Sequence, residues 1–174
     1  FDVSTATYVQ NFYVGAQEAD PSGITFNNDG TKMFVIGRTG DDVNEYSLST
    51  GFDVSTASYV QNFSVSAQEA DPSGITFNND GTKIFIVGYS GDDVNEYSLS
   101  TAFDVSTATY VQNFYVGAQE GGPSGITFNN DGTKMFIVGY WGVEVNEYSL
   151  STGFDVSTAS YVQNFSVSAQ ETGP

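Results

Sequence analysis

The sequence contains no cysteine and no histidine among its 174 residues. Disulfides and thiolate metal sites are therefore excluded, and so are a Cys nucleophile and a Ser-His-Asp triad. A carboxylate pair could still hydrolyse a glycoside. The acidic residues, however, recur in equivalent turns along the chain, whereas a catalytic site is usually a single asymmetric constellation. We therefore expect no enzyme and no cofactor.

Basic residues are also scarce: 4 Lys and Arg stand against 21 Asp and Glu, which gives a net charge of −17. Such a surface repels phosphate backbones and anionic lipids, so we expect neither nucleic acid nor membrane as a partner. No segment approaches the ~18 apolar residues of a membrane span. The acidity favours solubility, with cation binding or a salty environment as the alternative.

The residues that are abundant suggest where the protein works. Ser, Thr and Asn are frequent while Lys is rare, which favours an extracellular or cell-surface location. The first residue is Phe rather than Met, so we expect a processed product or a section of a longer polypeptide.

The chain consists of near-identical tandem repeats. The motif Phe-Asp-Val-Ser-Thr-Ala begins at Phe1 and returns at Phe52, Phe103 and Phe154, so the period is 51 residues (52 − 1). A fixed period of this size is typical of a fold in which each unit is one supersecondary element that cannot bury its apolar face alone.

Each unit is predicted to contain four short strands, because β-branched and aromatic residues alternate with polar ones between turn signals. The predicted inner strand is 23–27, followed by 32–37, 43–48 and an outer strand at 58–65. An Asn-Asn-Asp-Gly turn joins the first two. An additional outer strand is predicted at 7–14, for 13 strands in all.

The segment Pro-Ser-Gly-Ile-Thr-Phe-Asn-Asn-Asp-Gly-Thr-Lys-(Met/Ile)-Phe-(Val/Ile) occurs at 21–35, 72–86 and 123–137. It resembles the blade core of β-propellers of the broad YVTN and WD40-like kind. The resemblance implies an all-β chain of β-propeller blades, each a four-stranded antiparallel sheet. It says almost nothing about activity, because such propellers have many unrelated functions.

The resemblance divides the chain into residues 1–20, an outer strand that completes a preceding blade, and three blades at 21–71, 72–122 and 123–174. Rings of this kind typically have four to eight blades, so three blades form an open segment of a ring or of a longer array.

Open ends expose apolar faces and unpaired edges, so we expect the partner to be the chain itself. Two copies could close a six- or seven-bladed ring, further repeats of the same polypeptide could continue the array, or the ends could join into a fibre. The predicted function is a non-catalytic extracellular scaffold.

The alternative function is a lectin-like propeller that binds glycans. The units differ at the turn after the second strand, where Tyr89, Tyr140 and Trp141 could stack on sugars, although drift in exposed loops would produce the same differences. The candidate binding residues are Arg38, Asp41, Asp42, Tyr89, Asp92, Asp93, Tyr140, Trp141 and Glu144.

Two further features of the sequence have a structural and a functional interpretation. The acid pairs Asp41 with Asp42 and Asp92 with Asp93 offer oxygen ligands for a structural calcium ion. They lack the spacing of a calcium-binding loop, so we expect that the chain binds no metal ion. Asn62 and Asn164 match the N-glycosylation pattern and are candidate glycosylation sites. Both lie inside a predicted strand, so a chance match is the alternative.

Overall fold

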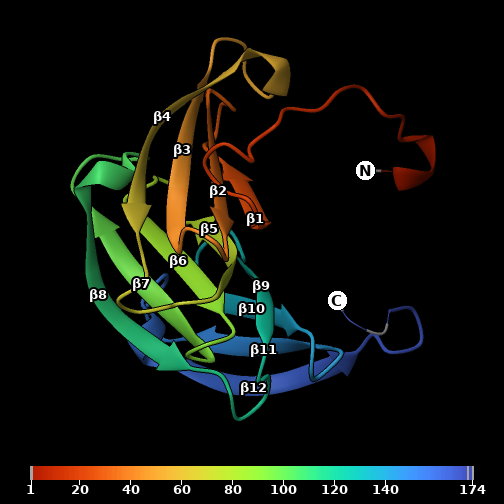
Figure 1. Cartoon of the computed structure of the whole chain (residues 1–174). Coiled ribbons are helices and arrows are strands. Elements are labelled where there is room, and N and C mark those ends of the chain that lie inside the picture. Colours follow the sequence, from red (N-terminus) through yellow and green to blue (C-terminus); the bar gives the residue numbers. More distant parts are fainter. Residues whose placement is uncertain (1, 172, 174) are drawn as a thin grey trace.

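The computed structural model describes residues 2–171 and 173, which form three four-stranded antiparallel sheets (Figure 1). In each sheet the strands are hydrogen-bonded in chain order. We call the sheets blade 1 (β1 to β4), blade 2 (β5 to β8) and blade 3 (β9 to β12). The strands of the described residues are β1 (Pro21–Phe26), β2 (Lys32–Gly37), β3 (Asp42–Leu48), β4 (Ala57–Ser64), β5 (Pro72–Phe77), β6 (Lys83–Gly88), β7 (Asp93–Leu99), β8 (Ala108–Tyr115), β9 (Pro123–Phe128), β10 (Lys134–Gly139), β11 (Glu144–Leu150) and β12 (Ala159–Ser166).

The helices of the described residues are short 3₁₀ turns of three residues each: η1 (Val3–Thr5), η2 (Val54–Thr56), η3 (Val105–Thr107) and η4 (Val156–Thr158). None of the described helices could cross a membrane. The predicted start of the first unit at Phe1 lies outside the described residues.

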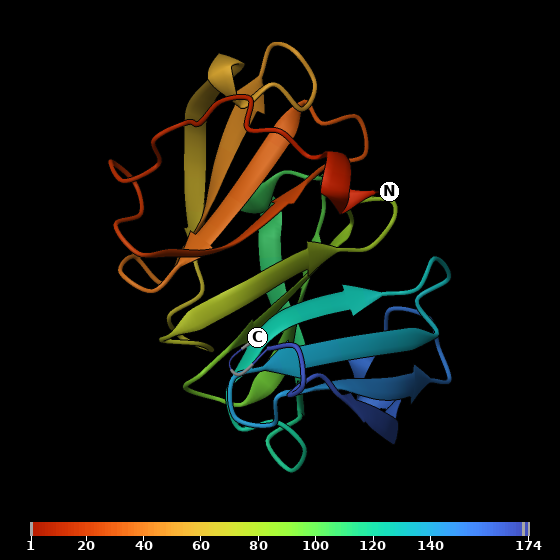
Figure 2. The same ribbon diagram turned by 90° about the vertical axis from the view of Figure 1, so that its right-hand side faces the viewer.

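The three blades follow one another along an arc. The outer strands β4, β8 and β12 lie along its periphery, and the first strands β1, β5 and β9 lie on the inside (Figure 1). The sheets are stacked in chain order, and both ends of the chain lie on the open side of the arc (Figure 2). The prediction of an all-β, open segment of three propeller blades is confirmed.

The tight turn between β1 and β2 forms because of its Asp-Gly pair. Gly30 has φ +73°, which glycine adopts without strain, and Asp29 Oδ1 accepts a 3.0 Å hydrogen bond from the Thr31 amide. A side chain at this glycine would also collide with the ring of Phe52, which covers the turn. The same turn opens blades 2 and 3, so near-identical sequences fold into near-identical hairpins.

The hydrophobic core lies between the blades. Along β2, Phe34 and Ile36 point toward blade 2, while Met33 and Val35 point to the opposite face, so the continuous apolar run is buried on both sides. Against Phe34 and Ile36 pack residues of blade 2 such as Tyr97. One blade therefore cannot bury its apolar side chains without a neighbour on each face.

The first predicted strand is wrong in one respect. Residues 6–14 are extended but pair with no strand, so the described residues contain twelve strands, not 13. The near-identical residues 57–64, 108–115 and 159–166 do form strands, because each pairs with the third strand of its own blade. No strand of the described residues lies beside the segment 6–14 in this way.

We predict that Gly74→Ala weakens the contact between the inner strands of blades 2 and 3. A Cβ at Gly74 would lie 2.8 Å from both the Ser124 carbonyl oxygen and Val87 Cγ2. Relief of this overlap should lower the free energy of unfolding by roughly 1–3 kcal/mol in urea titrations. The control Gly121→Ala introduces the residue that unit two carries as Ala70, at a position where the new Cβ would meet only Trp141 Cδ1, at 3.9 Å. An equal loss in both variants would contradict the prediction.

Candidate functional site

The contact between blades 1 and 2 is fastened by one buried carboxylate. Lys32 Nζ donates to Glu45 Oε1 at 2.7 Å and to the Phe103 carbonyl of blade 2 at 2.6 Å. Gln61 Nε2 donates to Glu45 Oε2 at 2.9 Å, and the Val105 amide of blade 2 donates to the same oxygen at 3.2 Å. Because both carboxylate oxygens are paired, the charge of Glu45 is compensated across the blade contact. We call this contact a junction.

The junction between blades 2 and 3 repeats this arrangement. Lys83 Nζ donates to Glu96 at 2.7 Å and to the Phe154 carbonyl at 2.6 Å, and the Val156 amide donates to Glu96 Oε2 at 3.1 Å. Blade 3 carries the first half of a third junction, since Lys134 Nζ donates to Glu147 at 2.6 Å. No described residue supplies the second half.

Blade 1 carries the other half of a junction, and the segment 6–14 covers part of it. The ring of Phe12 lies edge-on to Tyr46 with centroids 5.7 Å apart, as Phe63 lies on Tyr97 at 5.7 Å. Gln10 Nε2 donates to Asp53 at 2.5 Å, where Gln61 donates to the equivalent acid of blade 2. The segment thus occupies the position of an outer strand from a preceding blade.

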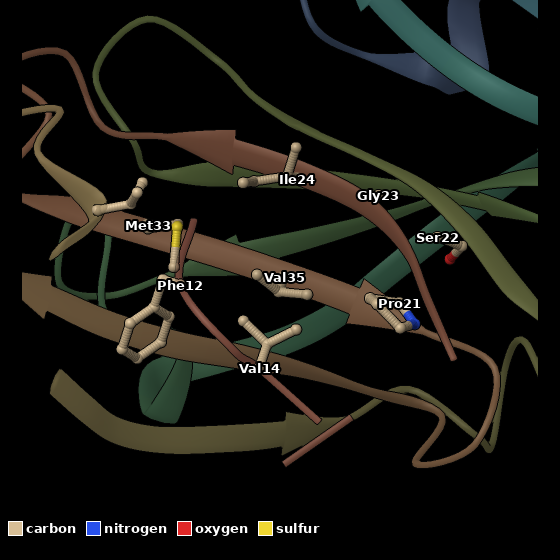
Figure 3. A pocket seen from close by; sticks show the side chains of 9 residues that line it. Phe12, Val14, Pro21, Ser22, Gly23, Ile24, Met33 and Val35 are labelled. Atoms are coloured by element: carbon tan, nitrogen blue, oxygen red, sulfur yellow. The ribbon is translucent and has the colours of Figure 1, made fainter. Parts of the chain in front are cut away.

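The remainder of this face of blade 1 is a hollow of about 350 Å³, lined by apolar side chains of β1, β2 and the segment 6–14 (Figure 3). Ile24 at its edge is 57% exposed, whereas the equivalent Ile75 inside a junction is 7% exposed. We call this face the leading flank. The hollow is lined by Phe12, Val14, Pro21, Ser22, Gly23, Ile24, Met33, Val35 and Val54.

The opposite face of blade 3 is the trailing flank, and it carries Phe136, Val138, Val145 and Phe165. Phe165 is 72% exposed, whereas its counterparts at the two junctions are partly buried. The first three residues line a second apolar hollow. Each end of the arc therefore presents one apolar half of a junction that occurs twice, complete, within the chain.

The candidate residues of the turns separate into two groups. Arg38, Tyr89, Tyr140 and Trp141 lie together with Asp71 around a hollow at one end of the blades. The Arg38 guanidinium lies 4.5 Å from the centre of the Tyr89 ring, and its Nε is 3.2 Å from Asp71 Oδ1. The structure thus gathers these residues from three blades into one site.

The second group consists of acids that serve the framework. Asp42 Oδ1 accepts from Asn44 Nδ2 at 2.6 Å, and its other oxygen accepts from Asn62; Asp93 is held in the same way. Burial raises the pKa of Asp42 and Asp93 above the ordinary value, more than these hydrogen bonds lower it. Within residues 2–171 and 173, no three acidic side chains are grouped so as to hold a metal ion.

Asp41 and Asp92 occupy turn positions with φ +49°, a conformation that aspartate tolerates better than most residues. The acid pairs of the sequence thus have a structural explanation in this fold. The bond from Asn62 to Asp42 also gives that asparagine a structural role, whereas Asn164 is exposed on β12. Glycosylation of either residue stays a prediction.

The sequence reasoning missed a buried carboxylate that holds the turn after the second strand. Glu18 is fully buried; its Oε1 accepts from the amides of Asp20 at 2.8 Å and Thr39 at 3.1 Å, and its Oε2 accepts from Gly40 at 3.1 Å. Glu69 and Glu120 repeat the arrangement. A single Glu within a polar loop gave no signal that backbone amides would enclose it.

The turn of unit three departs from the pattern of the other two units. Val143 has φ +51°, although a β-branched residue is strained there. Glu144 replaces the aspartate of the other blades, and the fully buried Asn146 then has neither its Nδ2 nor its Oδ1 hydrogen-bonded. Both features cost stability. Blades 1 and 2 avoid the strained valine and the unpaired Nδ2, although Asp41 Oδ1, Asn44 Oδ1 and Asp92 Oδ1 are also buried without a hydrogen-bond partner.

Comparison with solved structures shows the same fold in proteins of different kinds. A protein from Bacteroides fragilis that is assigned as a 6-phosphogluconolactonase aligns over 84% of this chain and 39% of its own chain, with 16% identity and a TM-score of 0.60. The periplasmic gluconolactonase PpgL of Pseudomonas aeruginosa aligns over 83% of this chain and 38% of its own, with 11% identity and a TM-score of 0.56. The β-propeller domain of Cps50 (Swd1) from Myceliophteria thermophila aligns over 84% of this chain and 43% of its own, with 11% identity and a TM-score of 0.53.

These likenesses show that the chain is a segment of β-propeller blades, and that it spans about two fifths of the length of those structures. At such low identity they show the fold alone. No protein-family model and no curated protein sequence matches the chain.

The prediction that the chain is not an enzyme is contradicted by these comparisons. Two of the structures that share its fold are named as lactonases, so this fold is one that carries catalysis. The recurrence of acids in equivalent turns and the lack of a Ser-His-Asp triad therefore do not exclude a reaction.

We predict that Asp93 titrates above Asp104. Burial raises the pKa of Asp93, whereas a hydrogen bond from the Ser106 side chain lowers the pKa of Asp104. Asp93 should therefore reduce stability progressively as the pH rises from the ordinary aspartate range through its folded pKa. Asp104 should stabilise the fold above that range and lose this contribution as the pH falls toward its own folded pKa.

Carbon-detected NMR of the side-chain carboxyls across acidic pH measures both groups in one sample, so that each serves as the control for the other. A midpoint of Asp93 at or below that of Asp104 would contradict the burial of its carboxylate.

We also predict that restoring the unit consensus stabilises blade 3. Val143→Asp combined with Glu144→Asp removes a strained β-branched residue and returns an acceptor to Asn146, which should raise the free energy of unfolding by about 2 kcal/mol. Urea unfolding measures the change. Met135→Ile, which introduces the unit-two residue without relieving strain, is the control and should have a smaller effect.

Proposed function

We propose that the chain is a structural module that assembles with a second copy of itself, trailing flank to leading flank, in an extracellular or cell-surface setting. The observation that carries this proposal is the junction: it occurs twice within the chain, and its two halves are exposed separately at the ends of the arc. The extracellular setting is supported by composition alone.

The polar parts of the junction support the same partner. At the trailing flank Lys134 and Glu147 repeat the pair that reaches into the next blade at both internal junctions. At the leading flank the carbonyl of Phe52 and the amide of Val54 hold the positions of Phe103 and Val105, which bind the pair of blade 1. A second copy would therefore complete the hydrogen bonds as well as the apolar contact.

The number of blades favours two copies. Each copy contributes three blades, and six is the only multiple of three among the four to eight blades of ordinary rings. Two trailing-to-leading junctions then close the ring, whereas the same contact with a rotation that does not close gives a filament. The net charge of −17 on each copy opposes association, so added salt should strengthen it.

The chain carries two segments for one position in such a ring. Residues 6–14 already lie on Tyr46 of their own blade 1, and β12 of a second copy would bring Phe165 to the same place. The two segments are near-identical in sequence, and each can complete blade 3 by pairing with β11. One of them must therefore be displaced at each junction.

We predict that Ile24→Glu prevents assembly, because it places a charge in the apolar contact of the leading flank. Light scattering coupled to size-exclusion chromatography, at about 0.15 M and 1 M salt, should change from a two-copy to a one-copy mass. The matched control is Val60→Glu: Val60 is 48% exposed, and its counterpart Val111 stays 47% exposed beside a junction.

Truncations test which segment fills the shared position. Removal of residues 1–14 or of residues 159–174 should each leave the two-copy mass intact, because the other segment replaces the missing strand. Removal of both should give single copies. A monodisperse single-copy mass of the full chain at both salt concentrations would refute the proposal, and so would assembly that Ile24→Glu leaves unchanged.

A further inference from the structure

Several of the differences between the units lie at one place in the folded chain. The residues after the second strand are Arg38 in unit one, Tyr89 in unit two, and Tyr140 with Trp141 in unit three, and they surround a hollow of about 280 Å³ together with Asp71. The equivalent turns of successive blades lie side by side in this fold, so differences at this turn form one continuous surface. The framework of the blades does not require them, because blades 1 and 2 fold with Thr and Ser where blade 3 has Trp.

Two changes in unit three depend on each other. A Cβ at Gly122 would lie 2.4 Å from Trp141 Cδ1, and the equivalent position in the other units is Asp20 or Asp71. The indole can occupy its position only because unit three carries glycine there. The large side chain and the space for it are therefore paired substitutions in an otherwise copied unit.

The same turn departs from the unit pattern at a cost to folding. Trp141 is 68% exposed, Val143 is strained, and Asn146 is buried without hydrogen bonds. Strain and exposed aromatic surface that the fold does not need are typical of sites retained for binding.

The chemistry of the hollow favours a neutral ligand with both apolar and hydroxyl surfaces. The rings of Tyr140 and Trp141 are 5.2 Å apart and nearly perpendicular, so they form two sides of an aromatic corner. Arg38 offers donors beside the Asp71 carboxylate, while its charge already lies over the Tyr89 ring. A cationic ligand would have to displace Arg38, and an anionic one would meet a chain with a net charge of −17.

We propose that this hollow binds a neutral saccharide, with an apolar ring face of the sugar on Trp141 or Tyr140 and hydroxyl groups on Arg38 and Asp71. The volume lies near the lower end of ligand sites, which suits one or two sugar residues. All five lining residues come from within one chain, so binding does not require the assembly proposed above and can be tested separately from it.

The experiment uses the full chain, a neutral-glycan array and tryptophan fluorescence. Trp141 is the single tryptophan of the sequence, so its emission reports directly on the hollow. A neutral glycan retained on the array should change this emission saturably. Tyr140→Ala should weaken the titrated affinity about tenfold or more, as expected for an aromatic anchor.

Trp141→Ser introduces the residue of unit two and should abolish retention on the array, while Tyr115→Ser, which also introduces a unit-two residue at an exposed position, should leave it unchanged. Circular dichroism of each variant verifies the fold. The proposal is overturned if no neutral glycan is retained, if the Trp141→Ser variant is retained as well as the parent, or if tetramethylammonium changes the emission while neutral sugars do not.

Discussion

Burial of apolar side chains between neighbouring sheets holds this fold together. The second strand of each blade directs large apolar residues to both faces, for example Phe34 to one side and Met33 to the other. A sheet of four short strands covers neither face by itself, so stability comes from neighbouring blades, as in other repeat architectures. The same constraint explains why the two ends of the arc expose apolar surface.

Charged side chains complete the junctions where apolar contact stops. Glu45 and Glu96 are buried, and each is paired with a lysine, a glutamine and a backbone amide of the next blade. Removing a partner from such a carboxylate leaves a buried charge uncompensated, which makes the contact selective for a face with the same groups.

Near-identity of the units makes the exceptions informative. In units one and two, Asp41 and Asp92 occupy the turn position with positive φ, which aspartate tolerates. Unit three carries Val143 at this position, together with an exposed Trp141 and a glycine beside the indole ring. Loss of local stability together with gain of an aromatic surface distinguishes this end of the blades from the rest of the molecule.

The period, the strand pattern and the turns could be predicted from the sequence, because alternation of apolar residues and an Asp-Gly pair act over a few neighbouring residues. It therefore predicted the blades and their order, and it identified Arg38, Tyr89, Tyr140 and Trp141 as candidates. That these four lie together follows from the stacking of the blades, since the three turns that carry them are one unit apart in the chain.

Tertiary contacts also determine burial and strand pairing that the local sequence pattern does not predict. Asp42 looked like a surface ligand but is buried against Asn44 and Asn62, and Glu18 looked like a loop residue but is enclosed by backbone amides. Residues 6–14 have the sequence of a strand, yet a strand needs a partner edge, and none lies beside them. Pairing, burial and the meeting of distant residues depend on neighbours in space, and a sequence specifies those neighbours only through the folded whole.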